Sequence, residues 1–535
     1  MERRTLTPRT LAPLFVPLLL AAWIAAQVTA VNRSQPGSPT VNVLYKFPYD
    51  GTPPNGYSHG KVVYSELIQG ADGNFYGTTV NGGSGLCADG FGVEGCGTIF
   101  KITSDGVETV LFNFTYDPNT NTAVNGMYPY GGLVQGRDGN FYGTASLGGN
   151  PNAGGNCLLG CGTIFRITPS GKFTLLHQFA GVGGNPAEGA SPTGRLILGS
   201  DGQFYGTTYS GGSVRYGVGN EGTIFSVSSS GAFTTLHTFD TVDGLDGANP
   251  YAGLIQGKDG NFYGTTYFGG TDGVGTVFRF SKSIGVTVLH SFVQPQHLNY
   301  PDGAFLQAAL IQASDGQFYG AATQGGVSAG GWGTLFKISP NGTFTKIFDL
   351  DPTGTFPGWY PLGGMIQASD GNLYGTTENG GPPDCNCGTA YQLTLAGKLS
   401  LLVGFEDVTD GRLPVSVPLQ GADGILYITN SRGPSIGPHD GGGTAIQISN
   451  GLPKPKPGIS KFLPTSGPIG QHVTISGVHF VGTTKVNFNG TGATFTVKST
   501  NTITATVPAG ATSGPITVTN AGGSFRSTAN FTVLP

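Results

Sequence analysis

The chain has 535 residues, more than one ordinary hydrophobic core requires, so several domains or a repeat array are expected. Its 93 glycines, 11% aromatic residues and only 10% charged residues favour many short strands joined by tight turns over amphipathic helices. The formal net charge of −4 argues against a nucleic-acid partner, because binding to a phosphate backbone needs an excess of positive charge.

Residues 1–30 have the pattern of a signal peptide. Arg3, Arg4 and Arg9 precede an apolar run at 11–26, and small residues at 28–30 offer a cleavage site. The competing interpretation is an uncleaved membrane anchor, since the run approaches the length of a short membrane span. We predict cleavage, which leaves a mature chain with no membrane span and a formal net charge of −6. The expected location is the periplasm, the cell surface or the medium.

Seven copies of one phrase follow. In the first copy a short strand at 67–69 leads to Asp72-Gly73-Asn74-Phe75-Tyr76-Gly77-Thr78. Each copy continues with a glycine-rich loop, a Gly-Thr-Ile-Phe phrase and a fourth strand, and the Asp-Gly favours a tight hairpin. Four strands repeated seven times predict an all-β, seven-bladed β-propeller over residues 41–450. At intervals that fall from 66 to 53 residues, the first Asp recurs as Asp138, Asp201, Asp259, Asp315, Asp370 and Asp423.

The two ends of the array complement each other. The seventh copy stops after the phrase at 443–448 and lacks a fourth strand, whereas residues 43–47 form a fourth-strand phrase before the first copy. A propeller must close without exposed strand edges. We therefore expect the N-terminal strand to complete the last blade.

The repeated phrase resembles the GloVer tandem repeat of exported, choice-of-anchor bacterial proteins. Asp-Gly-x-Phe-Tyr-Gly-Thr-Thr and Gly-Thr-Ile-Phe-Lys-Ile carry the resemblance, which covers residues 41–450. Two copies depart from it, because Ile428 replaces the glycine in the seventh and Ala321 replaces the threonine in the fifth. The resemblance implies a repeat architecture on exported proteins but no particular chemistry.

A proline-rich linker at 451–458 leads to a second domain at 459–535. Apolar and polar residues alternate there between turn residues, which predicts a small β-sandwich. The phrases at 464–467, 473–477 and 503–508 resemble those of an IPT/TIG immunoglobulin-like domain. Such modules usually act as spacers or contact surfaces, so the resemblance implies no enzyme.

Six cysteines form three close pairs in the sequence. Export favours local disulfides over a zinc site, because no histidine lies near these pairs. The third pair is left open, since only Asn386 separates its two cysteines and so small a ring is strained. The pairs are Cys87 with Cys96, Cys157 with Cys161, and Cys385 with Cys387.

No catalytic motif stands out. His177, His237 and His290 share one place on the predicted outermost strand, which favours a structural role. Turn chemistry explains the repeated Asp-Gly better than calcium binding does, and the repeated Tyr is interpreted as a packing position. We predict no metal and no cofactor. Three loop histidines without a recognisable partner are His59, His297 and His439.

One face of the predicted disc carries the candidate binding residues. The loops between strands two and three, which hold all six cysteines, open on the same face as the loops between blades, which hold aromatic residues. Function usually sits on loops held by a rigid scaffold, so we expect a ligand there. The alternative is that these loops are decorated turns. The predicted binding residues are Tyr57, Tyr128, Tyr130, Tyr251, Tyr300, Trp359 and Tyr360.

The sequence favours an exported, non-enzymatic binding or scaffold protein whose propeller face contacts an extracellular glycan or protein. Export, acidic charge and the tyrosine-rich face support this interpretation. Two rivals stay open: a polysaccharide-active propeller enzyme, either a hydrolase or a lyase, and a structural cell-surface component. The sequence therefore leaves catalysis and the identity of the ligand undecided.

Overall fold

The computed structural model shows a protein built from strands alone. No residue within the described ranges lies in a helix, so none of them contributes a helix able to span a membrane. The predicted all-β class is confirmed, whereas the predicted signal peptide lies outside the described residues. The structure describes residues 38–48, 60–85, 87, 95–120, 122–150, 157, 159–180, 188–212, 221–239, 244–295, 300–326, 331–352, 356, 358–382, 385–407, 409–433 and 442–535.

Antiparallel sheets follow the copies of the repeat, and consecutive strands pair within each sheet. The first sheet contains β3 (Ile68–Gln69), β4 (Phe75–Thr79), β6 (Thr98–Ile102) and β7 (Glu108–Asn113). The second contains β8 (Val134–Gln135), β9 (Phe141–Ala145), β10 (Thr163–Ile167) and β11 (Phe173–Gln178). The third contains β12 (Ile197–Leu198), β13 (Phe204–Thr208), β14 (Thr223–Val227) and β15 (Phe233–Thr238). The fourth contains β16 (Ile255–Gln256), β17 (Phe262–Thr266), β18 (Thr276–Ser281) and β19 (Gly285–Ser291).

The later copies build three more sheets in the same way. The fifth contains β20 (Ile311–Gln312), β21 (Phe318–Ala322), β22 (Thr334–Ile338) and β23 (Phe344–Asp349). The sixth contains β25 (Ile366–Gln367), β26 (Leu373–Thr377), β28 (Thr389–Leu393) and β29 (Leu399–Gly404). The seventh contains β30 (Arg412–Pro414), β31 (Leu419–Gln420), β32 (Leu426–Arg432), β33 (Thr444–Ser449) and β1 (Thr40–Lys46). Two small two-stranded sheets pair β2 (Gly60–Lys61) with β5 (Asn81–Gly82), and β24 (Gly358–Trp359) with β27 (Asn379–Gly380).

The repeated phrase forms the first turn and the second strand of each sheet. Gly73 adopts a φ of 84°, and the hydroxyl of the buried Tyr76 donates to Asp72 Oδ2 at 2.7 Å. The same tyrosine–aspartate bond occurs in all seven copies, at 2.6 to 2.9 Å. The repeated Asp and Tyr are therefore turn and packing residues, as the sequence predicts.

The repeated tyrosines also link neighbouring sheets. The Tyr76 ring packs on Phe141 of the second sheet at 4.1 Å between centroids, and Tyr427 of the seventh sheet packs on Phe75 of the first at 4.2 Å. Equivalent tyrosines pack on the next sheet at each intervening boundary. The seven sheets thus contact one another in a closed cycle, which we call the ring.

An N-terminal strand closes the ring. β1 pairs antiparallel with β33, with Thr40 opposite Ser449 and Lys46 opposite Thr444. Phe47, just after β1, is 2% exposed, and its amide donates to the Gly443 carbonyl at 3.0 Å. The prediction that this strand completes the seventh sheet is confirmed.

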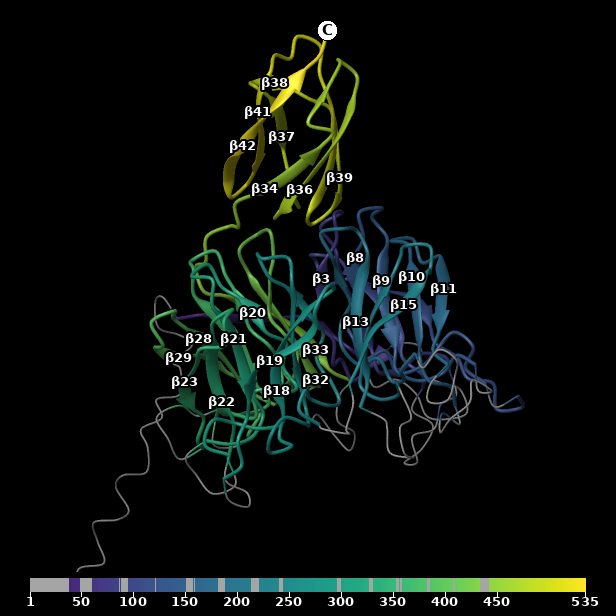
Figure 1. Ribbon diagram of the computed structural model, residues 1–535, viewed down its shortest axis with the longest axis vertical. Coiled ribbons are helices and arrows are strands. Elements are labelled where there is room, and N and C mark those ends of the chain that lie inside the picture. Colours follow the sequence, from purple (N-terminus) through teal and green to yellow (C-terminus); the bar gives the residue numbers. More distant parts are fainter. Residues whose placement is uncertain are drawn as a thin grey trace, which may run out of the picture.

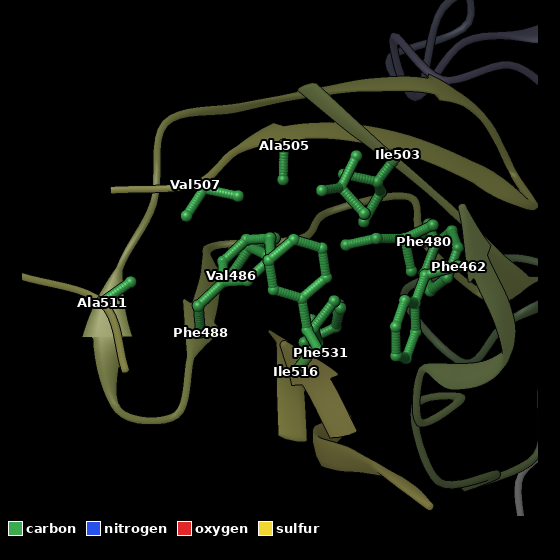
Figure 2. Close-up of a cluster of buried hydrophobic side chains, with 13 residues drawn as sticks. Phe462, Phe480, Val486, Phe488, Ile503, Ala505, Val507, Ala511, Ile516 and Phe531 are labelled. Atoms are coloured by element: carbon green, nitrogen blue, oxygen red, sulfur yellow. The ribbon is translucent and has the colours of Figure 1, made fainter. Parts of the chain in front are cut away.

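The C-terminal residues form two sheets around a separate core. One sheet contains β34 (Gly458–Leu463), β36 (His472–Val478), β40 (Thr502–Thr506) and β39 (Phe495–Ser499). The other contains β35 (Ser466–Gly467), β42 (Gly523–Val533), β41 (Gly514–Asn520), β37 (Lys485–Phe488) and β38 (Thr491–Gly492). Figure 2 shows the apolar side chains between the sheets, among them Phe480, Phe488 and Phe531. These two sheets form the predicted β-sandwich.

The sandwich stands on the side of the ring that carries the repeated Asp-Gly turns (Figure 1). Lys461 Nζ donates to the carbonyl of Ser200, which precedes the Asp-Gly of the third copy, at 2.9 Å. Gln420 of the seventh sheet donates to the Pro453 carbonyl at 3.2 Å. Because antiparallel strands alternate in direction, the loops after the second and fourth strands lie on the opposite side. We call that side the loop side.

Candidate functional site

All seven sheets contribute to one cavity at the centre of the ring. Its volume is about 590 Å³, and its walls are the first strands and the residues just before them. The first strands β3, β8, β12, β16, β20, β25 and β31 each have two residues. This cavity is the place where one ligand can touch every copy of the repeat.

Two positions of the repeat line the cavity in every copy. The outer position is eight residues before the repeated Asp, and the inner position is six residues before it. The first strand runs from the loop side toward the Asp-Gly turn, so the outer position is nearer the loop side. The outer residues are Tyr64, Tyr130, Thr193, Tyr251, Gln307, Leu362 and Val415; the inner residues are Glu66, Gly132, Arg195, Gly253, Ala309, Gly364 and Val417.

Three of the seven outer residues are tyrosines. The rings of Tyr64 and Tyr130 lie 5.7 Å apart, and Tyr251 lies 6.0 Å from Tyr209. Burial, with smaller contributions from neighbouring tyrosines such as Tyr130, raises the pKa of Tyr251 to about 12. These phenols are neutral at physiological pH, so they offer flat apolar rings that also carry a hydroxyl.

The inner residues hold one ion pair among small or apolar side chains. Arg195 Nε lies 3.0 Å from Glu66 Oε1, although the two residues come from the third and first sheets. Gly132 of the intervening second sheet leaves room for this contact, because a Cβ atom there would lie 3.0 Å from Glu66 Cδ. The ion pair therefore runs along the wall of the cavity from the first sheet to the third, and its two charges neutralise each other.

A carboxylic acid lies on the loop side near the tyrosines. Burial raises the pKa of Glu378 above its usual range, while the nearby Arg432 acts in the opposite direction. Burial and then Glu378 also raise the pKa of Tyr64, which exposes 40% of its surface. Glu378, Arg432 and Tyr64 come from the sixth, seventh and first copies of the repeat. These three side chains therefore come together only because the ring closes.

One backbone position places the outer residues. Two residues before each of them, a non-glycine residue adopts a φ between 54° and 60° in every copy. At Tyr128, for example, the amide donates to the Cys96 carbonyl of the preceding sheet at 3.0 Å, and the carbonyl accepts from the Ser146 amide at 3.1 Å. The left-handed turn thus directs the chain from the loop side into the first strand. The residues are Val62, Tyr128, Ser191, Asn249, Phe305, Tyr360 and Leu413.

The structure separates the predicted binding aromatics into groups. Tyr130 and Tyr251 line the cavity. Trp359 and Tyr360 instead pack with Trp332, with ring centroids 6.0 and 5.7 Å away.

Two other predicted aromatics do not line the cavity. Tyr128 is half-buried in the core between the first two sheets, and Tyr300 is only 7% exposed and packs against Phe305. The predicted residue Tyr57 lies outside the described residues. Sequence reasoning missed Tyr64, Glu66 and Arg195, which the fixed spacing before the repeated Asp would have found.

The three fourth-strand histidines have structural contacts. His177 Nε2 lies 3.0 Å from Glu188 Oε2, and its ring stacks on Phe233 of the next sheet at 4.0 Å. His290 likewise pairs with Asp302 at 2.7 Å, and His237 pairs with Asp246 at 2.9 Å. They lie on three different sheets, as the sequence predicts. The candidates His59, His297 and His439 fall outside the described residues.

The two predicted disulfides, Cys87 with Cys96 and Cys157 with Cys161, are formed. The pair that the sequence left open, Cys385 with Cys387, is also a disulfide. Among the described residues, no group of three or more histidine, cysteine, aspartate or glutamate side chains could hold a metal ion.

Two solved structures resemble this chain distantly. A fungal alcohol oxidase of the AA5 family in complex with copper is 12% identical, with 89% of this chain and 98% of that chain covered and a TM-score of 0.46. A luciferin-regenerating enzyme is 12% identical, with 60% and 92% covered and a TM-score of 0.35. A search of the curated proteins finds no significant match.

A family model covers most of the sequence. The model described as the Gloeobacter/Verrucomicrobia repeat matches residues 30–187, 92–310 and 296–495. These ranges include all seven copies of the repeated phrase and more than half of the chain. The chain therefore belongs to the Gloeobacter/Verrucomicrobia repeat family.

Proposed function

We propose that this chain is an exported, non-enzymatic binding protein that holds a neutral glycan in the central cavity of its ring. In this proposal the ring is a seven-bladed β-propeller over residues 41–450, and residues 459–535 are an IPT/TIG immunoglobulin-like domain. The cycle of seven sheets and the two-sheet sandwich support this architecture. The three disulfides are consistent with an oxidising compartment, and so with export.

The observation that carries the proposal is the convergence of Tyr64, Tyr130 and Tyr251 on one cavity. Sugars present an apolar C–H face that stacks on aromatic rings, and tyrosine adds a hydroxyl for hydrogen bonding. The volume of about 590 Å³ falls within the range typical of small-molecule pockets. An aromatic wall with few polar groups therefore suits a short stretch of a sugar chain.

The Glu66–Arg195 pair adds the polar side of the site. Its guanidinium donates hydrogen bonds and its carboxylate accepts them, so together they match the donor and acceptor character of sugar hydroxyls. Because the two charges neutralise each other, the pair gives no net attraction to an anion. This is why we propose a neutral glycan rather than an acidic one for the central cavity.

The proposal is tested by titrating the purified full chain with oligosaccharides from cellulose, starch and chitin in a calorimeter. We expect binding to one of them, and Tyr251→Ala should weaken it about tenfold, since loss of a stacked ring costs on the order of 1.4 kcal/mol. Phe525→Ala, on the sandwich and 37% exposed, is the matched control and should change nothing. Binding that survives Tyr251→Ala, or no binding to the panel, would contradict the proposal.

One observation favours a second candidate function, a polysaccharide-active enzyme. Glu378 lies near Tyr64 and has a raised pKa, as a general acid requires. Glycoside hydrolysis usually needs a second carboxylate, and Glu66 is already paired with Arg195. The same mixtures are therefore assayed for reducing ends. Release by the wild type that Glu378→Gln abolishes would replace the binding proposal by an enzymatic one.

A further inference from the structure

A second cavity lies between the ring and the sandwich. Its volume is about 410 Å³, and its walls come from the Asp-Gly turn of the second sheet and from the sheet β34-β36-β40-β39. Three cationic side chains line it, against a single carboxylate, in a chain whose formal net charge is −4. The cations are Arg137, Lys461 and Lys498, and the carboxylate is Asp138. We call this cavity the interdomain cleft.

Two of the cations are held close together without a counter-ion. Arg137 Nη2 and Lys461 Nζ each donate to the Ser200 carbonyl at 2.9 Å, so the two nitrogens are at most 5.8 Å apart. The adjacent Asp201 does not neutralise them, because it is paired with Lys282 at 2.7 Å. No described carboxylate lies within ion-pair distance of Arg137, Lys461 or Lys498. Their mutual repulsion would be relieved by a bound anion.

The one acidic side chain of the cleft is already engaged. Asp138 Oδ1 accepts from the Asn140 amide at 3.2 Å. Its Oδ2 accepts from Asn140 Nδ2 at 2.7 Å and from the Tyr142 hydroxyl at 2.8 Å. These bonds belong to the turn that every copy of the repeat forms. Asp138 is thus fixed in its turn rather than free to fold over the cations.

The sandwich presents cations and hydroxyls in a row across its strands. Lys461 on β34 is opposite Ser476 on β36, and Ser476 is opposite Thr502 on β40. Beyond Thr502, an irregularity in β39 between Val497 and Ser499 contains Lys498. The next row places Thr474 opposite Thr504.

Thr474, Ser476 and Thr504 of this patch are partly exposed, whereas Thr502 is only 3% exposed. The side-chain hydroxyls of Thr474, Ser476, Thr502 and Thr504 make no hydrogen bond within the described part of the chain. The three partly exposed hydroxyls can donate to an oxyanion without breaking an existing contact. The cleft therefore combines charge with uncommitted donors.

We propose that the interdomain cleft binds an acidic polysaccharide through its carboxylate or sulfate groups. Four strands separated by about 4.8 Å place Lys461 and Lys498 roughly 14 Å apart along the row. The Lys461 ammonium group already donates to the Ser200 carbonyl, so an extended chain with repeated charges can contact it and Lys498 without drawing the two lysines together. Arg137 on the ring completes the site, so a bound chain contacts both domains. This site is independent of the neutral-glycan site in the central cavity.

The test measures binding of fluorescently labelled oligogalacturonate and dextran sulfate to the full chain by anisotropy at low salt. Uncharged dextran and inorganic sulfate are the comparison ligands. We expect one acidic polymer to bind, dextran not to bind, and inorganic sulfate to compete only at far higher concentration. Lys498→Gln should weaken polymer binding about fivefold or more, and added salt should weaken it as well.

Lys498 is the informative position, because its side chain has no ion pair or hydrogen bond within the described residues and does not join the two domains. Lys485→Gln is the matched control: Lys485 is an exposed lysine on β37, in the other sheet of the same sandwich. It should bind as the wild type does. Equal binding by Lys498→Gln and wild type, equal binding of dextran, or failure of both acidic polymers to bind would overturn the proposal. Inorganic sulfate that binds as tightly as the polymers would also overturn it, in favour of a small-anion site.

Discussion

We expect opposite effects on stability when two buried tyrosines of the ring are each replaced by phenylalanine. The Tyr263 hydroxyl donates to Asp259 Oδ2 at 2.7 Å. The Tyr391 hydroxyl is buried and has no hydrogen-bond partner among the described residues. Replacing either tyrosine by phenylalanine removes only the hydroxyl, so the difference between the two variants isolates the value of its hydrogen bond.

The expected magnitudes follow from the partners. A hydrogen bond to an ionised carboxylate stabilises by about 1.5–3 kcal/mol, and the Asp259 side of this bond is partly exposed, so Tyr263→Phe should cost about 1.5 kcal/mol. An unsatisfied buried polar group costs about 1–3 kcal/mol, so Tyr391→Phe should be neutral or stabilising by about 1 kcal/mol. Phenylalanine fits this position, because the equivalent residue is Phe100 in the first copy and Phe336 in the fifth.

A third variant separates the hydroxyl from the ring. The Tyr263 side chain is fully buried, and its ring lies 4.0 Å from Phe318 of the next sheet. Tyr263→Ala should therefore cost the hydroxyl bond and about 3–5 kcal/mol more for the lost ring.

The assay is urea unfolding of the full chain, followed by tryptophan fluorescence and by circular dichroism. A Tyr391→Phe variant that is destabilised as much as Tyr263→Phe would refute the reasoning, since the two hydroxyls would then be equivalent. So would equal losses for Tyr263→Phe and Tyr263→Ala, since the ring would then contribute nothing to the contact between sheets.

Three further outcomes are expected. Phe47→Ala should lower the free energy of unfolding by about 3 kcal/mol and promote self-association measured by light scattering, because it loosens the strand that covers the edge of β33. Glu378→Gln should be more stable than wild type at pH 7 in thermal melts. Ionisation of Glu378 is disfavoured in the folded state, so wild-type stability falls as the pH rises above the ordinary glutamate pKa. The stability advantage of Glu378→Gln over the wild type should therefore vanish at lower pH. Burial lowers the pKa of His177, so the free energy of unfolding should fall as the pH drops below 6.5. If the His177→Gln variant loses as much stability over this pH range as the wild type does, His177 is not the cause.

The sequence alone determined the strands, their order and the closure of the ring. These features follow from local chemistry repeated seven times: Asp-Gly turns, alternating apolar residues, and a fourth-strand phrase displaced to the N-terminus. The spacing of Tyr76 after Asp72 also fixes their hydrogen bond, because a tight turn brings residues four apart within reach. Local patterns of this kind can be read without knowing how the sheets are arranged.

Tertiary structure decided the candidate site. Glu66 and Arg195 are 129 residues apart and come from sheets that are not neighbours, so only the ring brings their charges together, over Gly132. The predicted aromatics Tyr130 and Tyr300 occupy similar loops, yet one lines the cavity and the other is buried, because their distances from the repeated Asp differ. The cations of the interdomain cleft belong to two domains whose docking no local pattern encodes. Local sequence patterns therefore specify the sheets. Closure of the ring and docking of the sandwich determine which distant side chains come into contact.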